Sequence, residues 1–169
     1  WIMLLGLLLP GNINSQILKH AYTFNDGTAN DTVGTLNGTL VGDSISIANG
    51  KCTVKGATTS THGYIRLKAY DLAINTYSAV TLEAYLQAAS GKNTAFSMLA
   101  YFGNNVGGNK CFWIQPTRGG STQSRVETNN GSVTKTAYLD GIEIDDGKLH
   151  HVVAILSNKS LKYYLDGLL

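Results

Sequence analysis

The chain has 169 residues and a formal net charge of +2, and this length is enough for one domain with a substantial core. Charged residues make up 14% of the sequence, below the roughly 25% of an average globular domain. The sequence has no run of Lys or Arg residues, which argues against nucleic acid as a partner.

The first sixteen residues are predicted to lie outside the folded domain, which then covers residues 17–169. Residues 1–10 (WIMLLGLLLP) form an apolar run, shorter than the ~20 residues that a membrane-spanning helix needs. The run resembles the apolar part of a secretory signal peptide, with cleavage expected after Ser15. A buried first strand or helix is the alternative. We therefore expect export, with a secreted or cell-surface location and no stable membrane span.

Turn residues recur roughly every 8 to 12 positions, a spacing typical of an all-β sandwich or barrel. The runs between them are rich in β-branched and aromatic residues and predict strands. The predicted strands cover residues 18–24, 39–41, 44–55, 64–68, 79–88, 95–102, 110–115, 123–128, 133–139, 149–156 and 161–165. Helix formers in 82–89 compete with the strand prediction there, but the alternation of apolar and polar residues favours a strand. A short helical turn is expected near residues 70–74.

The predicted strand 149–156 is apolar on both faces, as a strand in the middle of a sandwich would be. Its two adjacent histidines, His150 and His151, project to opposite faces. They cannot hold one metal ion together, so structural roles are favoured over metal binding. The dipeptide Asp166-Gly167 predicts a tight hairpin turn after the last strand.

Three segments together resemble the laminin-G-like, concanavalin A-like jelly-roll domains of exported bacterial proteins. They are HAYTFNDGTANDTVGTLNGTLVG (20–42), AVTLEAYLQA (79–88) and DGKLHHVVAILSNKSLKYYLDGLL (146–169). Tyr85 and Leu149 stand where this family usually has Trp. The resemblance implies an all-β fold made of a two-sheet antiparallel β-sandwich.

Both ends of the sequence are expected to be incomplete. Neither an initiator Met nor a basic segment precedes the apolar run at the start. The family that the chain resembles continues with at least one more strand after a turn like Asp166-Gly167, whereas the sequence stops at Leu169. The predicted domain therefore lacks its C-terminal strand or strands.

Catalysis is not expected from this chain. Related jelly rolls include laminarinase-type glycoside hydrolases, whose retaining chemistry needs two carboxylates about 5 Å apart. Their signature places Glu, Asp and Glu at alternating strand positions. Glu143-Ile144-Asp145 matches only its start, and the following Asp146-Gly147 favours a turn. The GxSxG motif of nucleophilic hydrolases is also absent from the sequence.

Carbohydrate binding is the favoured function. Sugar-binding sandwiches stack an aromatic side chain on a pyranose ring and hold its hydroxyls with polar groups. In KCFWIQP (110–116), Cys111, Trp113 and Gln115 share one strand face. The predicted binding residues are Trp113, Tyr101, Tyr64, Arg66 and Arg125, with Glu83 and Tyr85 expected on the same surface. The alternative is a core tryptophan, the commoner role for Trp in a strand.

A structural calcium ion is a second expectation, since relatives of the resembled family often carry one. FNDGTANDTVG (24–34) contains Asp26 and Asp31, with Asn25 and Asn30 nearby, and hard cations prefer such oxygen donors. The spacing does not match an EF-hand. Asx turns, in which these side chains bond nearby backbone amides, are the alternative.

Cys52 and Cys111 have two interpretations of equal weight. In an oxidising compartment they can form one disulfide. In strand-like contexts they can equally be small buried apolar residues. No spacing of Cys and His in the sequence indicates a zinc site.

Taken together, these features predict a non-catalytic carbohydrate-binding or adhesion module of an exported protein. Its partner is expected to be a polysaccharide or glycoconjugate, with an extracellular protein as the other class. One alternative is part of a polysaccharide-processing enzyme whose catalytic groups lie beyond Leu169. The other is a structural or protein-interaction module.

Overall fold

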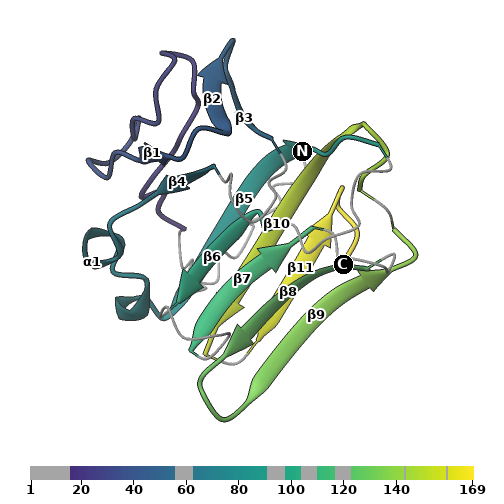
Figure 1. The fold of residues 1–169 in the computed structure, drawn as a ribbon. Coiled ribbons are helices and arrows are strands. Elements are labelled where there is room, and N and C mark those ends of the chain that lie inside the picture. The colour runs from purple at the N-terminus through teal and green to yellow at the C-terminus, as the bar shows by residue number, and fades with distance from the viewer. Residues whose placement is uncertain are drawn as a thin grey trace, which may run out of the picture. The chain divides into compact units, whose positions relative to one another are not determined.

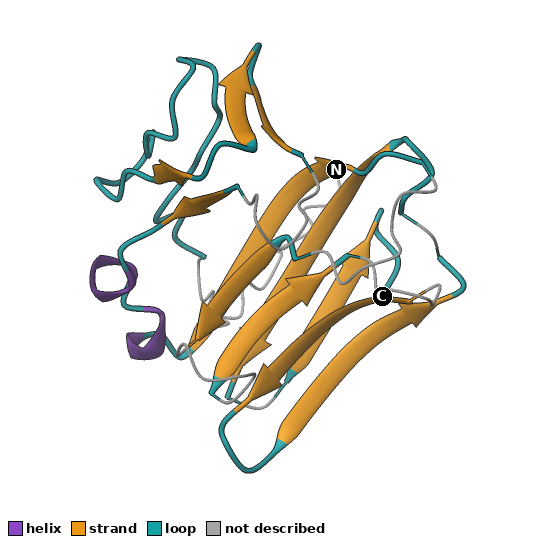
Figure 2. Cartoon of the chain, viewed as in Figure 1, coloured by secondary structure: helices purple, strands orange, loops and turns teal. Residues whose placement is uncertain are grey.

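The computed structural model describes residues 16–55, 63–90, 98–103, 110–116, 123–142, 144–158 and 160–169. The chain forms two compact units, Trp1–Leu72 and Ala73–Leu169. Long antiparallel strands dominate the second unit, whereas the first unit has short antiparallel strands joined by loops (Figures 1 and 2). The predicted all-β fold is confirmed. The signal-peptide-like segment lies outside the described residues, except for Gln16.

The first unit contains two small antiparallel sheets and one short helix. In the first sheet β1 (Thr39–Val41) pairs with β4 (Tyr64–Arg66), and in the second β2 (Ile45–Ala48) pairs with β3 (Lys51–Val54). Helix α1 (Ala69–Leu72) follows, and with the 3-10 helix Ile74–Thr76 it accounts for the helical turn expected near residues 70–74.

Two strand predictions for this unit are wrong. Residues 44–55 form a hairpin and not one strand, because Asn49 and Gly50 both have positive φ angles, 52° and 68°, as a type I′ turn requires. Residues 18–24 form no strand. The backbone of Ala21 bonds instead to a loop, accepting from the Thr32 N–H at 2.8 Å and donating to Asp31 Oδ1 at 3.0 Å.

The second unit contains two larger antiparallel sheets. The three-stranded sheet has the order β11-β10-β5, and the four-stranded sheet has the order β6-β7-β8-β9. Their strands are β5 (Ala79–Gln87), β6 (Ala100–Gly103), β7 (Cys111–Gln115), β8 (Gln123–Asn129), β9 (Thr134–Asp140), β10 (Leu149–Ser157) and β11 (Leu161–Leu165). Sequence patterns predicted each of these strands, in most cases with small differences at their ends. The strand predicted at 95–102 is β6, which begins only at Ala100; residues 98–99 form no strand, and 95–97 lie outside the described residues.

The two sheets of this unit pack face to face around one apolar core. The four-stranded sheet contributes Phe112, Ile114 and Val126, and the other sheet contributes Val152, Ala154, Tyr163 and Leu165. A buried contact of 2.5 Å between the hydroxyls of Ser124 and Tyr163 joins the two sheets. This arrangement is the predicted two-sheet sandwich, and β10 is the middle strand of its sheet, as predicted.

The hairpin turn after β11 has the predicted form. Asp166 and Gly167 have positive φ angles of 50° and 83°, the combination that a type I′ turn requires. Leu165 and Leu168 exchange two backbone hydrogen bonds across it, at 2.9 and 3.0 Å. Among the described residues, no helix is long and apolar enough to cross a membrane.

Candidate functional site

The outward side of the four-stranded sheet carries an aromatic and polar surface. Paired residues of antiparallel strands project to the same side, and residues that alternate with the core residues Phe112, Ile114 and Val126 project away from the core. Two cross-strand rows result, and we call them the aromatic face. It consists of Tyr101, Trp113 and Glu127 in one row, and of Gln115, Arg125 and Tyr138 in the next.

Arg125 covers Trp113 within the aromatic face. The guanidinium carbon of Arg125 lies 4.7 Å from the centre of the indole ring, a cation–π geometry. Arg125 Nε also donates to Gln115 Oε1 at 2.9 Å, and its Nη1 lies 3.6 Å from Glu127 Oε2. Trp113 is therefore only 8% exposed. The Trp113 ring therefore lies beneath the Arg125 guanidinium and exposes little surface to a ligand.

The exposed rings of the aromatic face belong to two tyrosines. Tyr101 is 45% exposed and Tyr138 is 54% exposed. The ring of Tyr101 runs along its own strand above Gly103, where an added Cβ would lie 3.0 Å from the tyrosine hydroxyl and 2.8 Å from Cys111 Cβ. Glycine at this position therefore leaves room for the ring.

Gln115 contributes a buried polar group beside these rings. Its side chain is fully buried, and its Oε1 accepts from Arg125. Its Nε2 has no hydrogen-bond partner among the described residues. Unpaired buried donors are uncommon, so a water or ligand oxygen at Nε2 would be stabilising.

The five predicted carbohydrate-binding residues divide between two sheets. Trp113, Tyr101 and Arg125 lie together on the aromatic face, on adjacent strands. Tyr64 and Arg66 lie on β4 in the first unit, where they pair with β1. These two residues share a sheet with none of the other three.

Glu83 and Tyr85 do not lie on the surface predicted for them. They project from the outward side of the three-stranded sheet, because Leu82 and Leu86 of the same strand pack against the core. Tyr85 is 67% exposed and stacks on the ring of His151, with 4.7 Å between centroids. Glu83 Oε1 lies 2.8 Å from His151 Nε2. The sandwich core separates them from Trp113.

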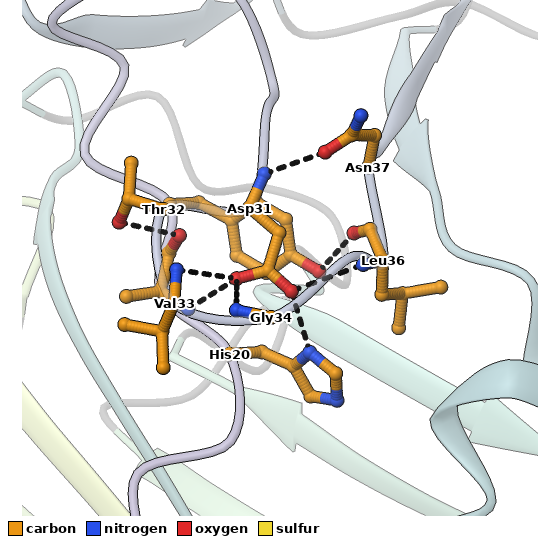
Figure 3. A network of polar contacts seen from close by, with 9 residues as sticks. His20, Asp31, Thr32, Val33, Gly34, Leu36 and Asn37 are labelled. Atoms are coloured by element: carbon orange, nitrogen blue, oxygen red, sulfur yellow. Dashed lines mark hydrogen bonds and ion pairs between the residues drawn. The ribbon is translucent and has the colours of Figure 1, made fainter.

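Asp31 is the centre of a hydrogen-bond network in the first unit (Figure 3). Its side chain has no exposed surface. Its carboxylate accepts five contacts at 2.7–3.2 Å, four from backbone N–H groups and one from an imidazole; the donors are Ala21, Val33, Gly34, Leu36 and His20 Nδ1. Burial alone would raise the pKa of Asp31, but these hydrogen bonds outweigh it and hold the pKa well below its usual range.

The loop around Asp26 and Asp31 does not fit calcium as it is arranged. Both carboxylate oxygens of Asp31 already accept hydrogen bonds from N–H groups, and the carboxylate of Asp26 accepts hydrogen bonds from Thr28 and Asn30. No group of three or more His, Cys, Asp or Glu side chains able to hold a metal occurs in the described part of the chain. The Asx-turn alternative is therefore observed, while calcium stays a prediction from the resemblance. No part of the function below depends on it.

The two histidines of β10 project to opposite faces, as predicted. His150 is buried between two carboxylates, with Nδ1 2.7 Å from Asp166 Oδ2 and Nε2 3.1 Å from Asp146 Oδ1. His151 lies on the outward side against Glu83. The backbone N–H of His151 donates to Asp166 Oδ1 at 2.8 Å. Both histidines have structural partners.

The segment that resembles a glycosidase motif is not a strand. Ile144 is buried in the core, and residues 144–148 form bends before β10 begins, which agrees with the predicted turn. Glu143 lies outside the described residues. Cys52 is half-buried and Cys111 is buried, and the structure has both as free thiols.

Tyr138, Gln115 and Glu127 belong to the aromatic face but were not among the predicted binding residues. Gln115 shares a strand face with Trp113, so alternation alone was a sufficient signal. Finding Glu127 and Tyr138 requires the register of β7, β8 and β9. For the β8–β9 pair the four-residue turn 130–133 sets this register, because it places Asn129 opposite Thr134 and therefore Arg125 opposite Tyr138.

Comparison with known proteins gives one match. A family model of the laminin G type, described as the concanavalin A-like lectin/glucanases superfamily, matches residues 59–169. The matched range includes β4 and all the strands of the second unit. No curated protein and no solved structure matches the chain significantly.

Proposed function

Because the chain belongs to the concanavalin A-like lectin/glucanases superfamily, we propose that it is a non-catalytic carbohydrate-binding or adhesion module of a secreted or cell-surface protein. Domains of this superfamily bind carbohydrate or protein in general, and laminin G-like domains are usually extracellular. The proposed ligand surface is the aromatic face, and the proposed ligand is a polysaccharide or glycoconjugate.

One observation carries this proposal: exposed tyrosine rings and hydrogen-bonding side chains share one face of a rigid sheet. Tyr101 and Tyr138 offer rings to the apolar side of a pyranose. Arg125 and Glu127 lie between them on β8, with donors and acceptors suited to sugar hydroxyls. The fully buried Gln115 accepts from Arg125 Nε and so helps to hold the guanidinium in place. The contact between Arg125 and Trp113 fixes the guanidinium before a ligand arrives, which lowers the entropic cost of binding.

The spacing of the two tyrosines favours an oligosaccharide over a single sugar. They lie on β6 and β9, the outer strands of the four-stranded sheet. Three strand spacings separate them, about 14 Å if neighbouring strands lie ~4.8 Å apart. A ligand that contacts both rings must therefore cross all four strands.

The carboxylates of the described residues support a non-catalytic role. Glycoside hydrolysis requires a pair of carboxyl groups, one of them an acid with a raised pKa. Glu127 is the carboxylate of the aromatic face, and it lies near Arg125 and Thr136. The aspartates with shifted pKa values all have lowered ones; they are Asp26, Asp31, Asp146 and Asp166. None of these four has the raised pKa of a general acid.

A glycan array followed by affinity measurements on matched variants tests the proposal. Tyr101→Ala and Tyr138→Ala are each expected to weaken binding to the best glycan about tenfold, the usual scale for loss of one aromatic contact. Tyr70→Ala is the control, because Tyr70 is 93% exposed on helix α1. Absence of binding to every glycan, or equal affinity for all four proteins, contradicts the proposed site.

One observation favours protein binding as the second candidate. Tyr85 and Leu149 are 67% and 66% exposed on the outward side of the three-stranded sheet, where Tyr85 pairs with His151 and Leu149 pairs with Gln87. Exposed aromatic and aliphatic side chains of this kind are enriched in protein interfaces. If a glycan array is negative, loss of binding to an extracellular protein in Tyr85→Ala would support this alternative.

A further inference from the structure

A hollow of about 160 Å³ opens between two hairpin turns at one end of the sandwich in the second unit. One turn joins β8 to β9, and the other joins β10 to β11. The residues that line the hollow are Thr128, Asn130, Val133, Lys135, Leu156, Ser157, Asn158, Ser160 and Leu161. None of them belongs to the aromatic face.

The described residues of the lining present the positive charge of Lys135 and several hydrogen-bond donors. Lys135 is the charged residue of the lining, and it forms no ion pair with a carboxylate of the described residues. The Oδ1 atom of Asn130 accepts the backbone N–H groups of Ser132 and Val133, at 2.9 and 2.8 Å. Its NH₂ group is therefore the part of the side chain left to donate a hydrogen bond to a ligand. A lysine beside amide donors suits a carboxylate.

Apolar side chains form part of the lining. Val133, Leu156 and Leu161 contribute it, and such a surface suits the C–H face of a sugar ring. The volume is below the roughly 300–1,000 Å³ of pockets for larger ligands. The hollow therefore accommodates about one ring and excludes a longer chain.

The turn that carries part of this lining is already fixed by internal hydrogen bonds. Ser160 N–H donates to Ser157 Oγ at 3.1 Å, and the backbone N–H of Ser157 donates to Ser160 O at 2.9 Å. On the opposite side, Asn130 N–H donates to Val133 O at 3.2 Å. Both sides of the hollow are thus preorganised, so binding would order few additional groups.

We propose that this hollow is a second binding site, which takes one carboxylate-bearing sugar residue of the uronate type. Lys135 pairs with the carboxylate, the amides of Asn130 and Asn158 hold ring substituents, and Leu156 and Leu161 contact the ring. The proposal goes beyond the aromatic face and does not depend on it. Acidic polysaccharides would then be held by a chain terminus or side residue at this end of the sandwich.

Titration of the full 169-residue chain with three small probes, followed by NMR or calorimetry, separates the parts of this proposal. The probes are glucuronate, glucose, which lacks the carboxylate, and acetate, which lacks the ring. We expect glucuronate to bind at least about tenfold more tightly than either, as when a charge-assisted contact and the ring contacts add. Equal affinity of acetate and glucuronate overturns the ring contacts, and equal affinity of glucose overturns the carboxylate contact.

Two lysine variants locate the charge. Lys135→Gln is expected to weaken glucuronate binding about tenfold and to leave the weak binding of glucose unchanged. Lys162→Gln is the matched control, because Lys162 is an exposed lysine of β11 outside the hollow. Unchanged affinity in Lys135→Gln, or an equal loss in both variants, overturns the proposal. Tyr101→Ala should retain glucuronate binding. The proposal for the hollow and the proposal for the aromatic face can therefore fail independently, and the variants show which of them has failed.

Discussion

His150 and Asp166 join the beginning of β10, the middle strand of its sheet, to the hairpin turn that follows β11, with Nδ1 and Oδ2 2.7 Å apart. The imidazole has 10% of its side-chain surface exposed, and the carboxylate has 47%. Burial by itself would lower the pKa of His150, but hydrogen bonds to Asp166 and Asp146 outweigh it and raise the pKa above its ordinary value of 6.5. The hydrogen bonds from His151 N–H and His150 lower the pKa of Asp166 below 3.8.

These opposite pKa shifts predict a window of greatest stability. A histidine with a raised pKa stabilises the fold fully below about pH 6.5, and this contribution is lost as pH rises through the raised value. A carboxylate with a lowered pKa stabilises the fold above about pH 4, and this contribution is lost as pH falls through the lowered value. We therefore expect the His150–Asp166 pair to contribute most between about pH 4 and 6.5.

Urea unfolding of wild type and His150→Gln checks this window. Wild type should have the higher free energy of unfolding, and its advantage over the variant should be about 1 kcal/mol larger at about pH 5.5 than at about pH 8.5. The effect is expected to be this small because solvent at Asp166 screens the pair. Asp140→Asn is the control, because Asp140 is a strand-end aspartate bonded only to Gln123 among the described residues. A difference between wild type and His150→Gln that does not change with pH would show that folding does not shift the pKa of His150, which contradicts the prediction.

The buried hydroxyl pair between the two sheets should show strong coupling. Ser124 and Tyr163 are buried at 0% and 2% exposure, with their hydroxyl oxygens 2.5 Å apart. Ser124→Ala and Tyr163→Phe each leave the other hydroxyl unpaired in the core, at a cost of about 1–3 kcal/mol. The double variant removes both polar groups and is expected to be more stable than the sum of the single effects predicts. Additive losses of unfolding free energy would mean that water replaces the missing partner.

Local sequence patterns predicted the strands of the sandwich because burial alternates along them. β5 is an example: Leu82 and Leu86 face the core while Glu83 and Tyr85 face outward, as its alternating sequence indicated. The prediction for residues 18–24 failed because a distant side chain decides that segment. The Asp31 carboxylate accepts a hydrogen bond from the Ala21 N–H, which is then not available to pair with a neighbouring strand. No local sequence pattern reveals this contact.

For the candidate site, the sequence predicted which residues share a strand face but not which sheet each strand joins. Alternation places Trp113 and Gln115 on one face of a strand, and Tyr101 and Arg125 were correctly associated with them. The surface predicted for Tyr85 was wrong because alternation does not say which sheet a strand enters. That choice depends on the pairing of β5 with β10, more than sixty residues away along the chain.

Asp31→Asn is expected to destabilise the loop of the first unit. The variant replaces one of two accepting oxygens with a donor that faces N–H groups, and loss of such charge-assisted hydrogen bonds costs about 2–4 kcal/mol. Hydrogen exchange of the Ala21, Gly34 and Leu36 amides should accelerate accordingly. Asp26→Asn is the matched control; its carboxylate belongs to an exposed turn, so these amides should keep their protection. Equal acceleration in both variants would show that Asp31 is not the centre of the network.

Arg125 is expected to control the solvent access of Trp113. The sequence contains two tryptophans, so a Trp1→Phe background leaves Trp113 as the single fluorophore. Because the guanidinium lies 4.7 Å above the ring and Trp113 is 8% exposed, acrylamide should quench its fluorescence weakly. Arg125→Gln removes the cation–π contact and should increase quenching about twofold or more. Arg66→Gln is the control, because Arg66 lies on β4 in the other unit. Equal quenching in all three proteins would show that the sheet alone buries the ring.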